Sequence, residues 1–202
     1  EDLEFNEGNF IIKGTDKKIS IFEIAKQMMN VKNEEEKNEK LSTFDTYTSG
    51  GATFPNGCHV VEVEVDPETG FSRIDKYTVI DDFGVVLNPM IVEGQIHGGI
   101  AQGIGQALLE DTIYDETGQL VTGSFMDYTM PRADNVPSID ISMNSFPCKT
   151  NPLGVKGAGE AGTTGATGAV INAIMNALSP LGVSHIEMPA TPQRIWESIN
   201  KI

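Results

Sequence analysis

The chain has 202 residues, of which 29 are Asp or Glu and 14 are Lys or Arg, so its formal net charge at pH 7 is -15. This charge argues against nucleic acid or anionic lipid as a partner, because both are themselves negative. The sequence has no apolar run near the roughly 20 residues that span a bilayer, and its charged start, EDLEFNEGNF, lacks the pattern of a signal peptide. We therefore expect a cytoplasmic protein with no nucleic-acid or membrane partner.

Residues 1–41 are expected to form an N-terminal appendage. The segment LEFNEGNFII alternates apolar and polar residues around Asn-Glu-Gly, which predicts a β-hairpin. Ser20 and Glu23 have the spacing of a capping box and precede apolar residues at helical spacing, so a helix is predicted over about residues 20–31. The charged run NEEEKNEK, residues 33–40, has no apolar residue and is expected to be a solvated linker.

Residues 42–202 are expected to form the main domain. From residue 59, HVVEVEVD alternates strictly and predicts a strand, which FSRIDKYTVIDD should follow as an antiparallel partner. Asn88 and Pro89 provide an N-cap and a first-turn proline for a long helix. The remaining predictions are strands near residues 119–129 and 137–146, a helix over about 164–178, and a short helix after Thr191-Pro192. Strands and helices in blocks indicate an α+β fold.

The two cysteines, Cys58 and Cys148, are far apart in the sequence and have no CxxC or Cys/His spacing. This pattern predicts neither a disulfide framework nor a zinc site. We expect both thiols to be free and buried.

The predicted helix over about residues 89–110 contains five glycines, and each costs about 1 kcal/mol relative to alanine inside a helix. Contacts outside the helix must offset that cost. On a helical wheel the small residues form one stripe, which consists of Gly94, Gly98, Ala101 and Gly105. An apolar face is formed by Ile96, Ile100 and Ile104. Beside the stripe lies a row of amide side chains, Gln95, Gln102 and Gln106. The stripe fits either close packing on another element or a wall against a large polar ligand, with Gln95 or Gln102 bonded to it.

The run PLGVKGAGEAGTTGATG, residues 152–168, matches GxGxxG at residues 157–162. A dinucleotide site would also need a buried strand before it and an acid about 20 positions later. Proline and glycine interrupt the preceding segment, and the next acid is Glu187, so that interpretation is weak. The lone acid, Glu160, is either a partly desolvated general base or an exposed residue that the dipole of the following helix favours.

Three ordered segments resemble the C-terminal part of the molybdenum-binding large subunit of the xanthine dehydrogenase and aldehyde oxidase family: GQIHGGIAQGIGQALLE (94–110), MDYTMPRADNVPSI (126–139) and GVKGAGEAGTTGATGAVINAI (154–174). The stretch GATFPNGCHVVEVEVDPETG (51–70) is similar to the strand pair that precedes them. The resemblance is continuous over residues 42–202 and looser over 1–41.

The resemblance implies an α+β molybdopterin-binding domain and a hydroxylase that acts on an aldehyde or an N-heterocyclic carbon with water-derived oxygen. The implied cofactor is molybdenum-molybdopterin or its cytosine dinucleotide form, whose dithiolene holds the metal, so no side chain is expected to ligate it. Glu160 stands at the position of the family's catalytic base, and Gln95 at that of a glutamine that contacts the cofactor. The backbone at Gly157, Ala158 and Gly159 would lie near the metal. His97 stands where other members have Glu and receives no role.

The resemblance also implies partners. Large subunits of this family are several times longer, and their upstream half supplies further cofactor contacts and most of the substrate pocket. Iron-sulfur clusters and FAD are expected on partner domains or subunits, because this chain has no cysteine pattern for such clusters. We therefore expect a C-terminal fragment or one piece of a split subunit. The alternative is a non-catalytic fragment or assembly subunit that does not bind cofactor alone.

Overall fold

The computed structural model describes residues 2–29 and 44–201, and the chain divides into two compact units, Glu1–Thr48 and Ser49–Ile202. The predicted linker at residues 33–40 lies outside the described residues. Within the described ranges, no helix is long and apolar enough to cross a membrane.

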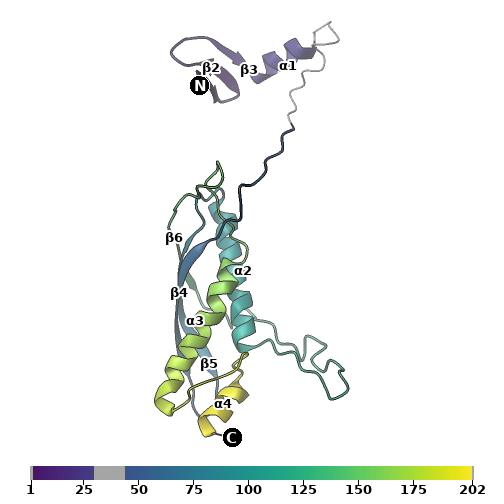
Figure 1. Ribbon diagram of the computed structural model, residues 1–202, viewed down its shortest axis with the longest axis vertical. Helices are drawn as coiled ribbons and strands as arrows, with labels where there is room; N and C mark the ends of the chain where they lie inside the picture. The colour runs from purple at the N-terminus through teal and green to yellow at the C-terminus, as the bar shows by residue number, and fades with distance from the viewer. Residues whose placement is uncertain (1, 30–43, 202) are drawn as a thin grey trace. The chain divides into compact units, whose positions relative to one another are not determined.

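The first unit is a small antiparallel sheet followed by one helix (Figure 1). Its elements are β1 (Leu3–Asn6), β2 (Asn9–Ile12), β3 (Lys18–Ser20) and α1 (Ile21–Met29). The predicted hairpin and helix are confirmed, and β3 was not predicted because three residues are too few to show a period. The capping box is also confirmed: Glu23 Oε2 accepts from the Ser20 N–H at 3.0 Å, and the Glu23 N–H donates to Ser20 Oγ at 3.1 Å.

The second unit is built on a three-stranded sheet in the order β4-β5-β6. The strand pair predicted around the DPETG turn is confirmed as β4 (Asn56–Val65) and β5 (Ser72–Asp82), which pair antiparallel. The strand predicted near 137–146 is β6 (Ile139–Met143), which pairs parallel to β5. Parallel pairing requires a crossover, and the long helix between β5 and β6 provides it.

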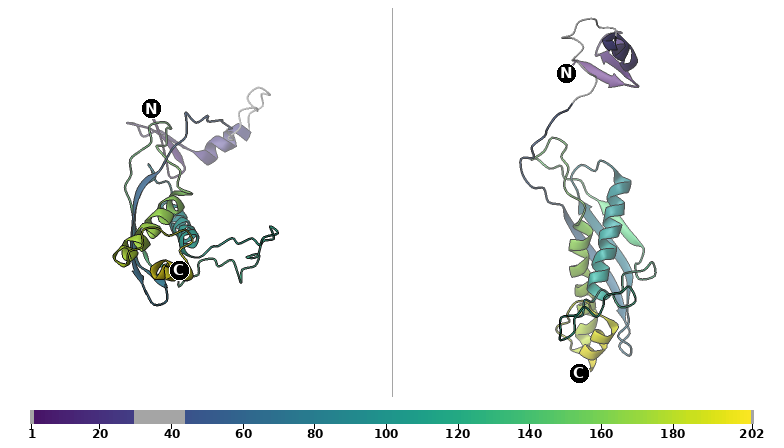
Figure 2. Two further views of the ribbon diagram at one scale, coloured as in Figure 1. Left: turned by 60° about the horizontal axis from the view of Figure 1, so that its bottom comes forward. Right: turned by 90° about the vertical axis from the view of Figure 1, so that its right-hand side faces the viewer.

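The two long helices, α2 (Pro89–Leu108) and α3 (Ala161–Leu178), lie side by side on one face of this sheet (Figure 2). Asn88 caps α2, since its Oδ1 accepts from the Ile91 N–H at 3.1 Å. A 3-10 turn (η2, Ser179–Leu181) and α4 (Pro192–Asn200) complete the unit. The helices start and end within a few residues of the predictions, and α3 begins at Ala161, ahead of the predicted residue 164.

The core lies between the sheet and the two helices. Tyr77 and Val79 of β5 are fully buried there, as is the predicted apolar face of α2, Ile96, Ile100 and Ile104. Burying such side chains contributes about 2 kcal/mol each, which helps to offset the glycines of α2.

Close packing of α2 on α3 accounts for two of the α2 glycines. A Cβ at Gly99 would lie 2.9 Å from the Thr163 nitrogen, and one at Gly103 would lie 2.5 Å from the Ala166 Cβ. These are not the residues of the predicted small-residue stripe. Gly94 and Gly98, which belong to that stripe, face open space, where an added Cβ would meet no described atom within 4 Å. Gly105, in the same stripe, is closed, since a Cβ there would lie 2.8 Å from Pro131 Cδ. The packing interpretation therefore holds for the α3 side of α2 and for Gly105, and the stripe is open at Gly94 and Gly98.

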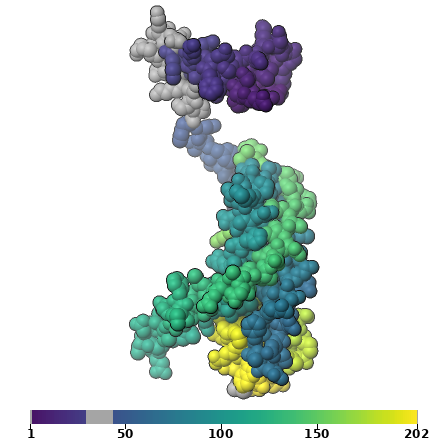
Figure 3. Space-filling view, turned by 180° about the vertical axis from the view of Figure 1, so that it is seen from behind, coloured from purple at the N-terminus to yellow at the C-terminus, as the bar shows by residue number. Residues whose placement is uncertain are grey.

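The strand predicted near residues 119–129 is wrong. The connection between α2 and β6 projects from the unit (Figure 3), and its only β-bridge among the described residues pairs Tyr114 with Leu120. The apolar residues that suggested a strand are exposed, with Phe125 at 78% and Met126 at 90%. The backbone groups of this segment bond locally, as when the Tyr128 N–H donates to the Ser124 carbonyl at 2.8 Å. A segment with apolar residues forms a strand only where a neighbouring strand can pair with it.

Candidate functional site

A pocket of about 580 Å³ lies where the start of β4, the end of β5 and the N-terminus of α3 meet. Its wall is formed by residues 53–57 and 157–161 together with His59, Asp81, Thr164 and Gly165. The glycine-rich loop and the segment before β4 are therefore brought together, although about a hundred residues separate them in sequence. The Gly157 N–H donates to Thr53 Oγ1 at 3.3 Å and links the two segments directly.

Glu160 stands at the N-terminal end of α3 and on the wall of the pocket. Its backbone caps the helix, with the carbonyl accepting from the Thr164 N–H at 3.0 Å, but its side chain makes no capping hydrogen bond. The residue is exposed, so the described residues do not desolvate its carboxylate. Of the two interpretations of this acid, the exposed one at a helix N-terminus describes its surroundings here.

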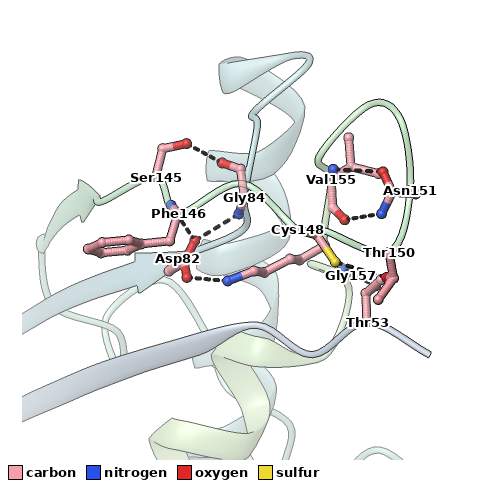
Figure 4. Close-up of polar contacts among 11 residues, drawn as sticks. Thr53, Asp82, Gly84, Ser145, Phe146, Cys148, Thr150, Asn151, Val155 and Gly157 are labelled. Carbon is pink, nitrogen blue, oxygen red and sulfur yellow. Dashed lines mark hydrogen bonds and ion pairs between the residues drawn. The ribbon is translucent and has the colours of Figure 1, made fainter. Parts of the chain in front are cut away.

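The loop that precedes Glu160 is fixed by Asp82, the last residue of β5 (Figure 4). Its Oδ2 forms an ion pair with the Lys156 ammonium, and its Oδ1 accepts from the backbone N–H groups of Gly84 at 2.8 Å and Phe146 at 3.0 Å. The Lys156 N–H also donates to the Phe83 carbonyl at 2.8 Å. The sheet end and the loop are thereby held as one body.

These contacts determine the ionisation of Asp82. Burial raises the pKa of this carboxyl, but the hydrogen bonds from Lys156 and from the Phe146 and Gly84 N–H groups outweigh burial and hold the pKa at about 2, below its ordinary value of 3.8. Asp82 is therefore a carboxylate whose charge and hydrogen-bonding capacity are both satisfied within the chain.

The adjacent residue, Asp81, has different surroundings. It is 2% exposed, its Oδ1 lies 3.6 Å from His59 Nε2, and its Oδ2 is buried without a hydrogen-bond partner among the described residues. On the other side of the imidazole, Nδ1 lies 2.7 Å from the Tyr77 hydroxyl, and the two rings meet edge to face. Burial and the Asp81 charge raise the pKa of Tyr77 well above its usual range, so its hydroxyl stays protonated. A chain of three polar side chains thus ends at the pocket wall.

The sequence interpretation did not single out His59 or Asp81, although a signal for each was present. Asp81 lies two residues after Val79 and four after Tyr77, so in a strand it shares their buried face. An acid at an inward position is uncommon without a partner and indicates a polar site. His59 stands directly opposite Val79 in the β4–β5 register and faces the same side.

The structure brings together some of the predicted site residues and leaves another outside the pocket. Glu160, Gly157, Ala158 and Gly159 all line it. Gln95 lies on α2, exposed, and is not among the lining residues. The roles assigned to these five residues stay predictions.

Two further polar residues of α2 have local partners. Gln102 Oε1 accepts from Thr163 Oγ1 at 3.3 Å, and the exposed His97 places Nδ1 2.9 Å from the Glu93 carbonyl oxygen. Across the described ranges, no group of three or more His, Cys, Asp or Glu side chains is gathered as a metal site.

Comparison with known proteins identifies the family. A family model described as the molybdopterin cofactor-binding domain matches residues 1–137. This chain belongs to that family. The match begins at residue 1 and so includes the N-terminal unit. The resemblance to molybdenum hydroxylase large subunits drawn from the sequence is confirmed.

Relatives of this chain include a hydroxylase large subunit, an oxidoreductase and a dehydrogenase. It is 47% identical over 142 residues to the nicotine 6-hydroxylase large subunit of Paenarthrobacter nicotinovorans, covering 70% of this chain and 17% of that protein. Quinoline 2-oxidoreductase from Pseudomonas putida 86 matches with a TM-score of 0.87 and 36% identity, over 99% of this chain and 26% of its own. CO dehydrogenase from Oligotropha carboxidovorans matches with a TM-score of 0.88 and 30% identity, over 99% of this chain and 25% of its own. The chain therefore spans about a quarter or less of these proteins, and the α+β fold is confirmed.

Proposed function

We propose that this chain is the part of a molybdopterin-dependent hydroxylase large subunit that lines the reaction centre and supplies its general base, Glu160. The observation that carries the proposal is a carboxylate without a side-chain capping bond, on the wall of a pocket of about 580 Å³, in a chain of the molybdopterin-binding family. The proposed substrate is an aromatic N-heterocycle or an aldehyde. Nicotine and quinoline, in the names of two relatives, are N-heterocycles.

The described residues leave room for a large cofactor. Gly157 and Gly159 line the pocket. On α2, a Cβ added at Gly94 or Gly98 would meet no described atom within 4 Å. The backbone of residues 157–159 and the Gln95 side chain are the groups that would hold the cofactor. When bound, molybdenum-molybdopterin supplies an activated oxygen nucleophile and takes up two electrons. These electrons would leave through iron-sulfur and FAD partners.

The residues of this chain would position groups and move a proton. The net reaction converts a C–H bond and water into a C–OH group, two protons and two electrons. Glu160 would accept the proton of the oxygen nucleophile on its carboxylate as the C–O bond forms, which is general base catalysis. The Asp82–Lys156 ion pair would hold the loop that carries Glu160 at a fixed place on the sheet.

The test is Glu160→Gln in the assembled enzyme, with the upstream part of the large subunit and the redox partners co-expressed. We expect turnover of pyridines, quinolines or aldehydes, followed by dye reduction, to fall by about 10²- to 10⁴-fold, because that is the usual contribution of a general base. Molybdenum and pterin content should be unchanged. Glu116→Gln, an equivalent change on the projecting connection and outside the pocket lining, is the control and should keep wild-type turnover.

Two results would contradict the proposal. Near-normal turnover by the Glu160→Gln enzyme would remove Glu160 as the base. An assembled wild-type complex that contains neither molybdenum nor pterin would favour the alternative, a non-catalytic assembly fragment.

A further inference from the structure

The structure assigns a second binding group to the Glu160 pocket: we propose that Asp81, which is buried beside His59, binds a nitrogen-bearing hydrogen-bond donor of the ligand that fills this pocket. The donor would be an amino group or a protonated amine. This inference rests on the proposed function and extends it, since Glu160 is assigned to proton transfer and Asp81 to recognition.

The first argument is the unpartnered oxygen. Asp81 Oδ2 is the one buried side-chain nitrogen or oxygen without a hydrogen bond in the described part of the chain. A buried acceptor of this kind is costly to leave unsatisfied, and more so when it is charged. Because Asp81 also forms part of the pocket wall, a donor on a bound ligand can satisfy it from that side.

The second argument is that the neighbouring residues are shaped around this carboxylate. Gly57 stands opposite Asp81 in the β4–β5 register, and a Cβ there would lie 1.8 Å from Asp81 Oδ1. Gly165 of α3 makes similar room for the imidazole, since a Cβ there would lie 2.5 Å from the His59 ring. Absence of side chains at both positions allows the carboxylate and the imidazole to be buried side by side.

The third argument is the direction of the imidazole. The Tyr77 hydroxyl needs an acceptor in its fully buried position, and His59 Nδ1 at 2.7 Å provides one. If Nδ1 is the acceptor, a neutral imidazole carries its ring proton on Nε2, which lies 3.6 Å from Asp81 Oδ1. Oδ1 therefore lies 3.6 Å from an N–H group of the chain, beyond hydrogen-bond distance, and Oδ2 has no partner among the described residues.

The charge of the wall determines the ligand chemistry. The described residues that line the pocket include two carboxylates, Glu160 and Asp81, one imidazole, and no lysine or arginine. The nearest lysine in the loop, Lys156, is already paired with Asp82. Such a wall favours a cationic or donor-rich nitrogen group over an anion. Two sources could present this group, namely the amino-bearing pterin of the cofactor and an amine-bearing substrate.

The test is Asp81→Asn in the assembled enzyme, with two measurements that separate the sources. Pterin content, measured as the fluorescent oxidation product after denaturation, reports on the cofactor. The ratio of kcat/KM for a pyridine with a protonated aminomethyl group to that for the matched methylpyridine reports on the substrate. Loss of a charged hydrogen bond corresponds to about 10- to 100-fold, so we expect one of the two quantities to fall by at least about tenfold.

The midpoint of thermal unfolding separates a binding role of Asp81 from a structural one, because only a structural role predicts that Asp81→Asn lowers the midpoint. If Asp81 is kept for binding, Asp81→Asn removes a buried charge without a full set of partners, and the unfolding midpoint should be equal to or above that of the wild type. Asp140→Asn is the matched control, because it makes the same change at an exposed position of β6 that is outside the pocket lining. It should leave pterin content and the kcat/KM ratio within about threefold of wild type, less than the value of one neutral hydrogen bond.

Should Asp81→Asn fail to fold, Gly57→Ala provides the same test, since its Cβ displaces the carboxylate without removing it. Pterin content and kcat/KM ratio both equal to wild type in the folded variant would overturn the inference. The inference would also be overturned if Asp81→Asn lowered the midpoint of thermal unfolding as far as a Lys156 variant does, because Asp81 would then be a structural group. Wild-type complex without pterin would overturn the proposed function and this inference together. Retained turnover by Glu160→Gln would remove only the base assignment, because pterin content and unfolding are measured without turnover.

Discussion

Asp81 and Asp82 are adjacent on β5, both are buried, and their surroundings are opposite in kind. Asp82 has a lysine and two backbone N–H groups, and its pKa is held at about 2. Asp81 has one histidine at 3.6 Å and an oxygen without a partner among the described residues. Because consecutive strand residues point to opposite faces, Asp82 meets the loop that carries Glu160 and Asp81 meets the pocket.

This difference separates a structural carboxylate from one that is available to a ligand. Groups that hold a fold together are satisfied within it, whereas groups that bind are incomplete until the ligand is present. The glycines of α2 show the same contrast. Gly103 is closed against α3, while Gly98 faces open space in the described residues.

The largest expected effect is the loss of stability when the Asp82–Lys156 ion pair is broken. Lys156→Met removes the ammonium and leaves the Asp82 carboxylate buried with only its N–H donors. Breaking such a pair should lower the free energy of unfolding by about 3 kcal/mol. Urea unfolding followed by the fluorescence of Trp196, the single tryptophan, measures it. Lys76→Met, at an exposed position of β5, should change stability by no more than about 0.5 kcal/mol. An equal loss in both variants would show that the pair is not structural.

The second effect is a dependence on pH. The folded pKa of Asp82 lies below its ordinary value, so its stabilisation is fully present above about pH 4 and is lost as the pH falls toward 2. A shift from 3.8 to about 2 corresponds to about 2 kcal/mol. Asp82→Asn has no carboxylate to titrate, so its free energy of unfolding should fall by about 2 kcal/mol less than that of the wild type over this range. Parallel curves for the two proteins would contradict the assignment.

Sequence reasoning predicted the elements that local patterns encode and missed those that depend on distant partners. Strict alternation in β4 and the caps at Ser20, Asn88 and Thr191 were sufficient to find most strands and helices. The apolar residues near residues 119–129 were misleading, because no strand of the described residues lies beside that segment to pair with it.

The candidate site divides in the same way. Glu160 and its glycine-rich loop could be predicted because they are contiguous and resemble a family motif. The pairing of Asp82 with Lys156 and the approach of His59 to Asp81 could not be predicted, since each joins residues that become neighbours only when β4, β5 and the loop assemble. Whether the stripe that contains Gly94 and Gly98 is packed or open could not be predicted either, because helical spacing alone does not show which face of α2 meets α3.

The smallest expected effect tests the open side of the comparison on α2. An added Cβ at Gly98 would meet no described atom within 4 Å, so Gly98→Ala should raise the free energy of unfolding of the chain by up to about 1 kcal/mol through helix propensity alone. Gly103→Ala should do the opposite and cost about 1 to 3 kcal/mol, because its Cβ would lie 2.5 Å from the Ala166 Cβ. If this side receives the cofactor in the assembled enzyme, Gly98→Ala should also lower pterin content while it stabilises the isolated chain. A stabilised variant with full pterin content would instead show that Gly98 lies outside the cofactor's contact surface.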